Sequence, residues 1–127
     1  MTYIQRIDHR PSAENLSSDE EARLARIFDA YGAEMVASGQ TIRWEHLEAV
    51  EVVVAPHIGG VSGWFVKRVL MRGEERYHVG LYYGADEAVL PNISWDMARY
   101  VLHIIAFYAP QPVEYTGPEG LVDLTEI

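Results

Sequence analysis

Residues 95–108 constrain the fold of this chain more than any other part of the sequence. Ser94 is a favourable N-cap for a helix there, and Pro110 would end that helix. The strongly polar residues within the stretch are Asp96, Arg99 and His103. At about 100° per residue these three fall on one narrow stripe, so the rest of the helix surface is apolar. A face this broad must pack on a large partner, and the strands that precede it predict a sheet in that place.

Residues 41–90 have the composition of strands joined by short turns. The segments rich in β-branched and aromatic residues are 41–44, 50–55, 64–71, 77–83 and 87–90. Residues 72–76 have the composition of a hairpin turn, and residues 84–86 form a second short connection. We expect Pro56 and Pro91 to end the strands before them, because proline cannot donate a ladder hydrogen bond. This order predicts an antiparallel meander covered by the helix.

The chain before the meander allows two interpretations. Ser18 followed by Glu21 is a capping-box pattern that begins a helix. The apolar residues that follow at helical spacing are Leu24, Ile27, Phe28, Tyr31 and Met35. Either the helix tolerates Gly32 and continues to Gly39, or it ends near residue 27 and the chain turns into strands. Periodicity by itself favours the longer helix.

We predict one domain of 127 residues with an extended segment at each end. Residues 1–17 form an N-terminal arm, residues 18–109 the folded body and residues 110–127 a C-terminal tail. The residues that oppose regular structure in the tail are Pro112, Gly117, Pro118 and Gly120. The tail is nevertheless too apolar to be wholly disordered, so we expect it to lie along its own domain or a neighbouring subunit.

Three packing patterns resemble those of bacterial pleckstrin-homology-like (PH-like) barrels. The residues that carry the resemblance are Trp44, Leu47 and Val50, then Leu90 and Pro91, then the helix at 95–108. The resemblance covers residues 33–109. It implies an α+β fold of mainly antiparallel strands: a partly open barrel of about seven strands capped by one C-terminal helix, with a short N-terminal helix. Because the barrel requires strands at 27–31 and 33–38, we expect the shorter helix; with the longer one, a generic α+β sandwich is the alternative.

The charge balance and the missing cysteine exclude several classes of function. Ten Lys and Arg oppose 19 Asp and Glu, a net charge of -9, so we expect neither nucleic acid nor an anionic membrane as a partner. A chain without cysteine has no thiol nucleophile, disulfide or iron–sulfur ligand. No apolar stretch reaches the roughly 20 residues of a membrane helix, and the N-terminus lacks a secretory signal, so we expect a cytoplasmic protein.

The sequence contains no motif of an enzyme or of a cofactor site. Its histidines are His9, His46, His57, His78 and His103. No two of them are four residues apart, as a zinc-binding helix requires. Residues 60–63 do not match Gly-x-Ser-x-Gly, the pattern of a nucleophilic serine. We therefore expect a protein without catalysis, cofactor or metal.

The first of three candidate surfaces is the final helix. Its residues at the edge of the buried face or outside it are Arg99, Tyr100, His103 and Phe107. Exposed aromatic residues beside a polar stripe are typical of a contact surface, although packing against the tail is the plain alternative. We predict an interaction module that binds a protein, a second copy of itself included, through this helix or through a sheet edge.

The other two candidate surfaces come from charge and from aromatic content. The basic residues concentrated on one predicted hairpin are Lys67, Arg68, Arg72 and Arg76. In phosphoinositide-binding members of the resembling family a basic hairpin captures the headgroup, which implies an anionic lipid or ligand; charge pairs on a solvated face are the alternative. The residues that could line the pocket of a small-molecule-binding protein or a small enzyme are Trp44, Trp64, His78, Tyr82 and Tyr83. Aromatic residues that simply fill the core are the alternative for this set.

Overall fold

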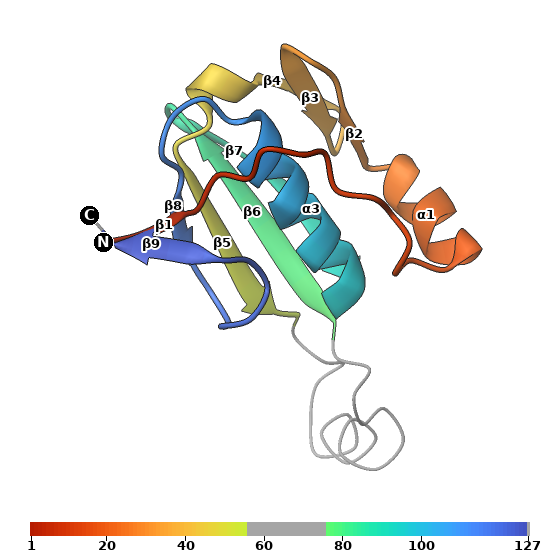
Figure 1. Cartoon of the computed structure of the whole chain (residues 1–127). Helices are drawn as coiled ribbons and strands as arrows, with labels where there is room; N and C mark the ends of the chain where they lie inside the picture. The colour runs from red at the N-terminus through yellow and green to blue at the C-terminus, as the bar shows by residue number, and fades with distance from the viewer. Residues whose placement is uncertain (56–75, 127) are drawn as a thin grey trace, which may run out of the picture.

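The computed structural model describes residues 1–55 and 76–126 (Figure 1). In chain order the elements are β1 (Thr2–Ile4), α1 (Ser18–Ala25), β2 (Phe28–Ala30), β3 (Glu34–Ala37), β4 (Gln40–Arg43), the 3₁₀ helix η1 (Trp44–His46), β5 (Ala49–Val54), β6 (Tyr77–Tyr83), β7 (Asp86–Ile93), α3 (Trp95–Tyr108), β8 (Glu114–Thr116) and β9 (Leu124–Glu126). The predicted α+β class with mainly antiparallel strands is confirmed. Pro56, the predicted strand at 64–71 and residues 72–75 of the predicted hairpin turn at 72–76 lie outside the described residues.

Six strands form the larger sheet, in the order β7-β6-β5-β8-β1-β9. Neighbouring strands in it are antiparallel except β5 and β8, which pair in parallel. The two ends of the chain meet at one edge, where Thr2 pairs with Glu126, and Figure 1 shows both termini there. The sheet therefore joins segments from the whole length of the chain.

The helix α3 lies across one face of this sheet (Figure 1). The side chain of Ser94 accepts a hydrogen bond of 3.2 Å from the backbone N–H of Met97, so Ser94 is the N-cap that the sequence predicted. The buried residues of α3 are Met97, Ala98, Val101, Leu102, Ile104, Ile105 and Ala106. The sheet contributes alternate buried residues from β5 and β6, including Val50, Val79 and Leu81. Each such side chain stabilises the fold by roughly 1.5–3 kcal/mol when fully buried, so this layer is the main part of the core.

The strands β2, β3 and β4 form a separate three-stranded sheet. Since η1 follows β4 directly and turns the chain, β4 does not pair with β5. The turn between β3 and β4 lies against the outer edge of β7: the Ser38 hydroxyl donates to the carbonyl oxygen of Val89, and Gln40 Nε2 donates to that of Glu87. The described strands thus form two sheets that do not close, and the expected partly open barrel of about seven strands is not confirmed.

The helix α1 is the shorter of the two helices that the sequence allowed. It ends at Ala25, and Phe28 begins a strand that pairs with β3. The expected shorter helix is therefore confirmed, and the longer helix that periodicity by itself favoured is not formed. The strands expected at 27–31 and 33–38 agree with β2 and β3 within a few residues. Phe28 in β2 and Met35 in β3 are both buried in this three-stranded sheet, so their burial does not require a helix. Tertiary pairing outweighs helical spacing here.

The N-cap of α1 is one residue earlier than predicted. Ser17, and not Ser18, has the extended backbone of an N-cap, and its hydroxyl accepts a hydrogen bond of 3.1 Å from the N–H of Glu20. The Glu20 carboxylate in turn accepts one of 3.1 Å from the N–H of Ser17. These reciprocal bonds are a capping box, displaced by one position from the Ser18–Glu21 pair that the pattern suggested.

Pro91 does not end its strand, which corrects the sequence prediction. The strand β7 continues through it to Ile93 and lies at the edge of the sheet, where the missing N–H of a proline leaves no partner unsatisfied. The pairing of β6 with β7 is irregular between Tyr77 and Val79. At this irregularity Asn92 has a φ of 56°, and its N–H donates to Nδ1 of His78 at 3.0 Å. An irregularity of this kind interrupts the regular pairing and bends the strand locally.

Both ends of the chain contain strands that the sequence did not predict. The strand β1 lies in the predicted N-terminal arm, and β8 and β9 lie in the predicted irregular tail. The tail packs on its own domain, one of the two places expected for it. Its buried residues are Val113, Tyr115, Leu121 and Val122. Proline and glycine content is a poor guide in this segment, because short strands depend on the partners that satisfy their backbone groups.

Candidate functional site

The polar stripe of α3 faces outward as its spacing predicted. Asp96 and Arg99 are exposed, and His103, one turn after Arg99, is half-buried. Tyr100 lies beside the stripe and is also half-buried. The helix therefore presents a polar edge and one aromatic ring to whatever lies next to it.

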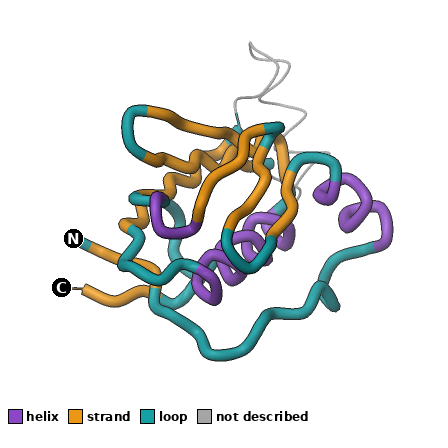
Figure 2. Tube along the Cα trace, turned by 90° about the horizontal axis from the view of Figure 1, so that it is seen from above, coloured by secondary structure: helices purple, strands orange, loops and turns teal. Residues whose placement is uncertain are grey.

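The segment next to this edge is the N-terminal arm, which we now define as residues 5–16, between β1 and α1. Figures 1 and 2 show it as a long loop that crosses α3 and then leads to α1. The N–H of Ile7 donates to the carbonyl oxygen of Ala106 at 3.2 Å, and Leu16 packs against the core at the other end. The arm is thus fixed at both ends of its path, with a space left between it and the helices.

The first depression beside the arm is bounded by α1, β2 and α3 and has a volume of about 500 Å³. Its large apolar and aromatic lining residues are Leu16, Leu24, Phe28 and Tyr100. Glu21 and Asp29 are on its rim and are exposed. This depression offers an apolar floor with acidic groups at its outer side.

The second depression continues from the first and has a volume of about 320 Å³. The side chains that carry or can carry charge in its lining are His9, Arg10, Asp96, Arg99 and His103. Arg10, Leu16 and Tyr100 line both depressions. We call the two together the arm groove, with the first as its apolar part and the second as its polar part.

The guanidinium group of Arg10 is held by two tyrosines of α3. Its Nε donates a hydrogen bond of 3.1 Å to the hydroxyl of Tyr108, and its Cζ lies 6.0 Å from the centre of that ring. The hydrogen bond to Tyr108 is the largest cause of a raised pKa of Arg10, and Tyr100 contributes as well. The Tyr108 ring is stacked on Trp44 with a centroid distance of 5.1 Å and an interplanar angle of 8°. Arg10 is therefore oriented in advance of any ligand.

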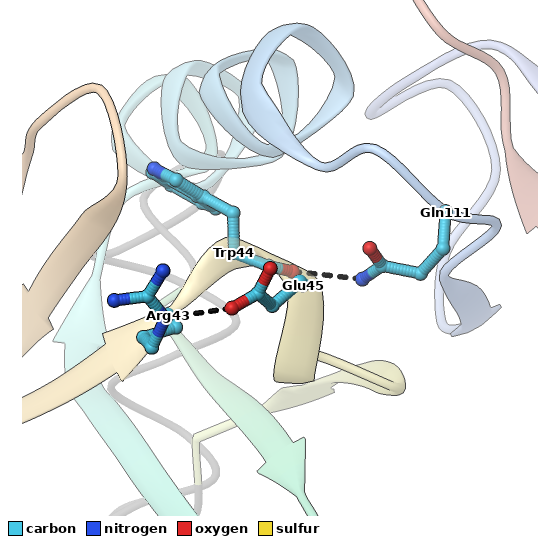
Figure 3. Close-up of polar contacts among 4 residues, drawn as sticks. All are labelled: Arg43, Trp44, Glu45 and Gln111. Atoms are coloured by element: carbon cyan, nitrogen blue, oxygen red, sulfur yellow. Dashed lines mark hydrogen bonds and ion pairs between the residues drawn. The ribbon is translucent and has the colours of Figure 1, made fainter.

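Figure 3 shows the polar contacts around Trp44, the tryptophan of this stack. Gln111 follows α3, and its Nε2 donates to the carbonyl oxygen of Trp44 at 2.8 Å. The same nitrogen donates to the carbonyl oxygen of Leu47 at 2.6 Å. Arg43 Nε donates to the carboxylate of Glu45 at 2.7 Å. The Gln111 bonds fix η1, and through it the indole on which Tyr108 rests.

His103 presents one nitrogen to the groove. Its Nδ1 lies 2.7 Å from the carbonyl oxygen of Arg99, which can only accept, so Nδ1 carries a hydrogen and donates. Nε2 is left for a ligand: it accepts when the ring is neutral and donates when the ring is protonated. The Arg99 guanidinium forms no ion pair with any residue in the described parts of the chain.

The remaining predicted site residues lie elsewhere. Phe107 packs edge-on against Tyr108 at 4.9 Å and lines neither depression. Lys67, Arg68 and Arg72 lie outside the described residues. Arg76 is half-buried just before β6. The pKa of Glu20 is lowered mainly by the hydrogen bond from Ser94, and the charge of Arg76 adds to this effect.

The predicted aromatic pocket is not assembled by the residues that the structure describes, and Trp64 lies outside them. Trp44 is only 2% exposed, with Tyr108 against its ring and its Nε1 donating to the carbonyl oxygen of Tyr31 at 2.7 Å.

His78 and Tyr82 alternate with the buried residues of β6 and so lie on the sheet face away from α3. The hydroxyl of Tyr82 donates to Glu51 at 3.0 Å, and this bond raises its pKa to about 12. Tyr83 donates to Gln40 instead, and none of these residues lines the arm groove.

Sequence reasoning placed Arg99, Tyr100 and His103 on the outer face of the final helix but missed the arm that completes the groove. Arg10 and Leu16 come from a segment without periodicity, and Phe28 was assigned to a helical stripe. The available signal was the occurrence of basic and apolar residues together in an arm that has no regular pattern. This composition does not indicate which helix or strand the arm packs against, so the groove could not be predicted from the sequence.

Comparison with protein-family models, with curated proteins and with solved structures found no match for this chain. Within residues 1–55 and 76–126, no three His, Asp or Glu side chains are grouped as a metal site would require. None of the described helices has both the length and the apolar character to cross a membrane. The fold and the site together define an α+β domain with a solvent-open groove of mixed character between an N-terminal arm and its long helix.

Proposed function

We propose that this protein is a non-catalytic interaction module that binds a short segment of a partner protein in the arm groove. The observation that carries the proposal is the continuity of an apolar depression with a cationic one through Arg10 and Tyr100. Tyrosine and arginine are the residues most often responsible for binding energy at protein interfaces. Arg99, Tyr100 and His103, which the sequence indicated as a contact surface, line the polar part.

The shape of the groove favours a segment of polypeptide over a compact small molecule. The residues on its rim, such as Arg10, Glu21 and Asp29, are exposed, so the groove leaves one side of an occupant in solvent. Small-molecule sites usually enclose 70–90% of a ligand's surface. A peptide keeps one side solvated without penalty. A small molecule or a substrate in the same groove is the alternative, and an anionic lipid at the basic hairpin gains no support from the described residues.

The resemblance to PH-like barrels is part of this proposal, and so is a cytoplasmic location. The support for the resemblance is the run of antiparallel strands followed by one long helix, together with the β2–β3 hairpin in the place where the family pattern requires strands. A sheet edge is a second place for a partner. The strand β9 is an edge strand of three residues, a length that offers few backbone groups for strand addition.

A selection from a library of random dodecapeptides displayed on phage tests the proposal. We expect enriched peptides to bind the wild-type protein with micromolar Kd, and to bind the Tyr100→Ala variant at least tenfold more weakly. Tyr82→Ala is the matched control, since Tyr82 is also a half-buried tyrosine but lies on the sheet face away from α3. Circular dichroism of both variants checks that they fold. Failure of the library to enrich, or equal loss in the two variants, would contradict the proposal.

A further inference from the structure

The polar part of the arm groove is cationic in a chain whose net charge is -9. Its lining combines Arg10, Arg99 and two histidines with a single carboxylate, that of Asp96. Elsewhere in the described chain, the arginine with an ion pair is Arg43, which is bonded to Glu45. His9 is paired with the carboxylate of Asp8 at 3.2 Å, whereas Arg10 and Arg99 form no ion pair with a described residue. Two guanidinium groups that keep their charge free of internal partners are a site for an anion.

The donors in this part are oriented and available. Arg10 uses Nε for Tyr108 and also interacts with Tyr100, and the remaining N–H groups of its two terminal nitrogens can donate to a ligand. The Arg99 guanidinium is exposed and forms no ion pair with a described residue, and His103 offers Nε2. Because the stack of Tyr108 on Trp44 fixes Arg10, less conformational entropy is lost when an anion binds.

The opposite end of the groove determines where an anion can lie. The apolar part carries Glu21 and Asp29 on its rim, and these repel a negative group. Its floor accepts a large apolar side chain against Phe28 and Leu24, both buried. An occupant that satisfies both parts therefore has an apolar side chain at one end and an anionic group at the other.

We propose that the segment recognised by this protein carries a carboxylate side chain next to a phenylalanine- or leucine-sized residue, with the carboxylate held by Arg10 and Arg99, and by Nε2 of His103 when its ring is protonated. This inference rests on the proposed function and specifies its ligand. Arginine binds a carboxylate with two parallel hydrogen bonds, and charge-assisted bonds of this kind are stronger than neutral ones. Asp96, on the same stripe, disfavours a second acidic residue beside the first.

Titration of the ¹⁵N-labelled full chain with blocked dipeptides tests the inference. The probes are acetyl-Glu-Phe-amide and acetyl-Phe-Glu-amide, and the comparison peptides replace Glu with Gln, Phe with Ala, or Glu with phosphoserine. We expect shift changes at Arg10, Arg99, Tyr100 and His103, and about tenfold weaker binding when Gln replaces Glu. In the Arg99→Gln variant the difference between Glu and Gln should fall to about twofold. Arg99 is exposed, so this substitution leaves the spectrum of the core unchanged.

Five outcomes would overturn the inference. Equal binding of the Glu and Gln peptides, or a Glu preference that survives Arg99→Gln, would show that the cations do not recognise the carboxylate. Phosphoserine binding more than tenfold tighter than Glu would assign the site to a phosphate instead. Binding of none of the dipeptides would remove the inference, while the library selection above judges the proposed function separately. Selected peptides without acidic residues would support the proposed function and contradict this inference.

Discussion

The carboxylate of Glu20 accepts a hydrogen bond of 2.5 Å from the hydroxyl of Ser94, a residue 74 positions away in the chain. Each of the two residues also belongs to a helix N-terminus: Glu20 completes the capping box of α1, and Ser94 caps α3. One carboxylate thus links the starts of the two helices that line the arm groove. The position of α1 relative to α3 depends on this link.

We expect Ser94→Ala to destabilise the protein by about 1–2 kcal/mol, because it removes an N-cap and the bond to Glu20. Ser17→Ala removes only the cap of α1 and should cost about 1 kcal/mol. Urea denaturation followed by tryptophan fluorescence measures both. If Ser94→Ala cost no more than Ser17→Ala, the link between the helices would contribute nothing to stability.

The same carboxylate predicts a pH dependence. The hydrogen bond from Ser94 is the largest cause of a pKa of Glu20 below its usual value of 4.5. The bond therefore adds stability above the pKa of the unfolded chain, and this stability is lost as the pH falls through the lower pKa of the folded state. The contribution is below about 1 kcal/mol since the group is partly exposed. Glu20→Gln should thus be less stable than the wild type at pH 7. The difference in stability between the two proteins should shrink as the pH falls below about 4. Urea denaturation at pH 7 and at low pH measures this difference.

Gln111 should be essential for the position of η1. Gln111→Leu removes two bonds to the carbonyl oxygens of Trp44 and Leu47, and we expect it to cost about 1–3 kcal/mol. Gln111→Glu should be more harmful at pH 7 than at pH 4, because an ionised carboxylate would face those two oxygens. Thermal denaturation at the two pH values measures the difference. An unchanged melting temperature for Gln111→Leu would contradict the structural role given to this residue.

Two glycines provide a matched pair for a test of the tail. A Cβ at Gly117 would lie 2.7 Å from the Tyr115 hydroxyl oxygen and 3.0 Å from Cβ of Val52, whereas a Cβ at Gly32 would meet nothing within 4 Å. We expect Gly117→Ala to destabilise the protein by about 1–3 kcal/mol through overpacking, and Gly32→Ala to change stability by less than about 0.5 kcal/mol. Equal effects in chemical denaturation would mean that the tail does not pack on β5 in solution.

Tyr108→Phe tests how Arg10 is oriented for binding. The substitution keeps the ring on Trp44 but removes the hydroxyl that accepts from Arg10 Nε. We expect a peptide selected from the library to bind about fivefold more weakly, with little change in melting temperature, because a freer Arg10 loses more entropy when it binds. Tyr82→Phe, which loses a bond to Glu51 away from the groove, is the control. Fluorescence anisotropy of the labelled peptide gives both affinities.

Predictions from the sequence were best where an element depends on its own residues. The helix at 95–108, its N-cap Ser94 and the strand at 77–83 are confirmed with the predicted boundaries. Helical periodicity, a capping side chain and a following proline act within a few residues, so the sequence displays them directly. The outward position of Arg99 and His103 follows from the same periodicity.

Predictions failed where a segment depends on a partner far away in the chain. Helical periodicity by itself favoured a helix to Gly39, but these residues form β2 and β3 because β4 pairs with β3. Pro91 was expected to end a strand but fits inside β7 because that strand lies at an edge. The tail forms β8 and β9 because β1 and β5 provide partners for its backbone. None of these partners is visible in a local pattern.

The sequence by itself determined the class of the fold, the long helix and the polar stripe that this helix turns outward, because charge, apolar spacing and capping are local properties. Only the tertiary structure decided that the N-terminal arm crosses that helix and that Arg10, 98 residues from Tyr108, is held against its ring. A groove is made by surfaces that meet after folding. Its residues therefore share no pattern along the chain. They are brought together by the free energy of contacts throughout the folded domain and not by interactions between neighbours in the sequence.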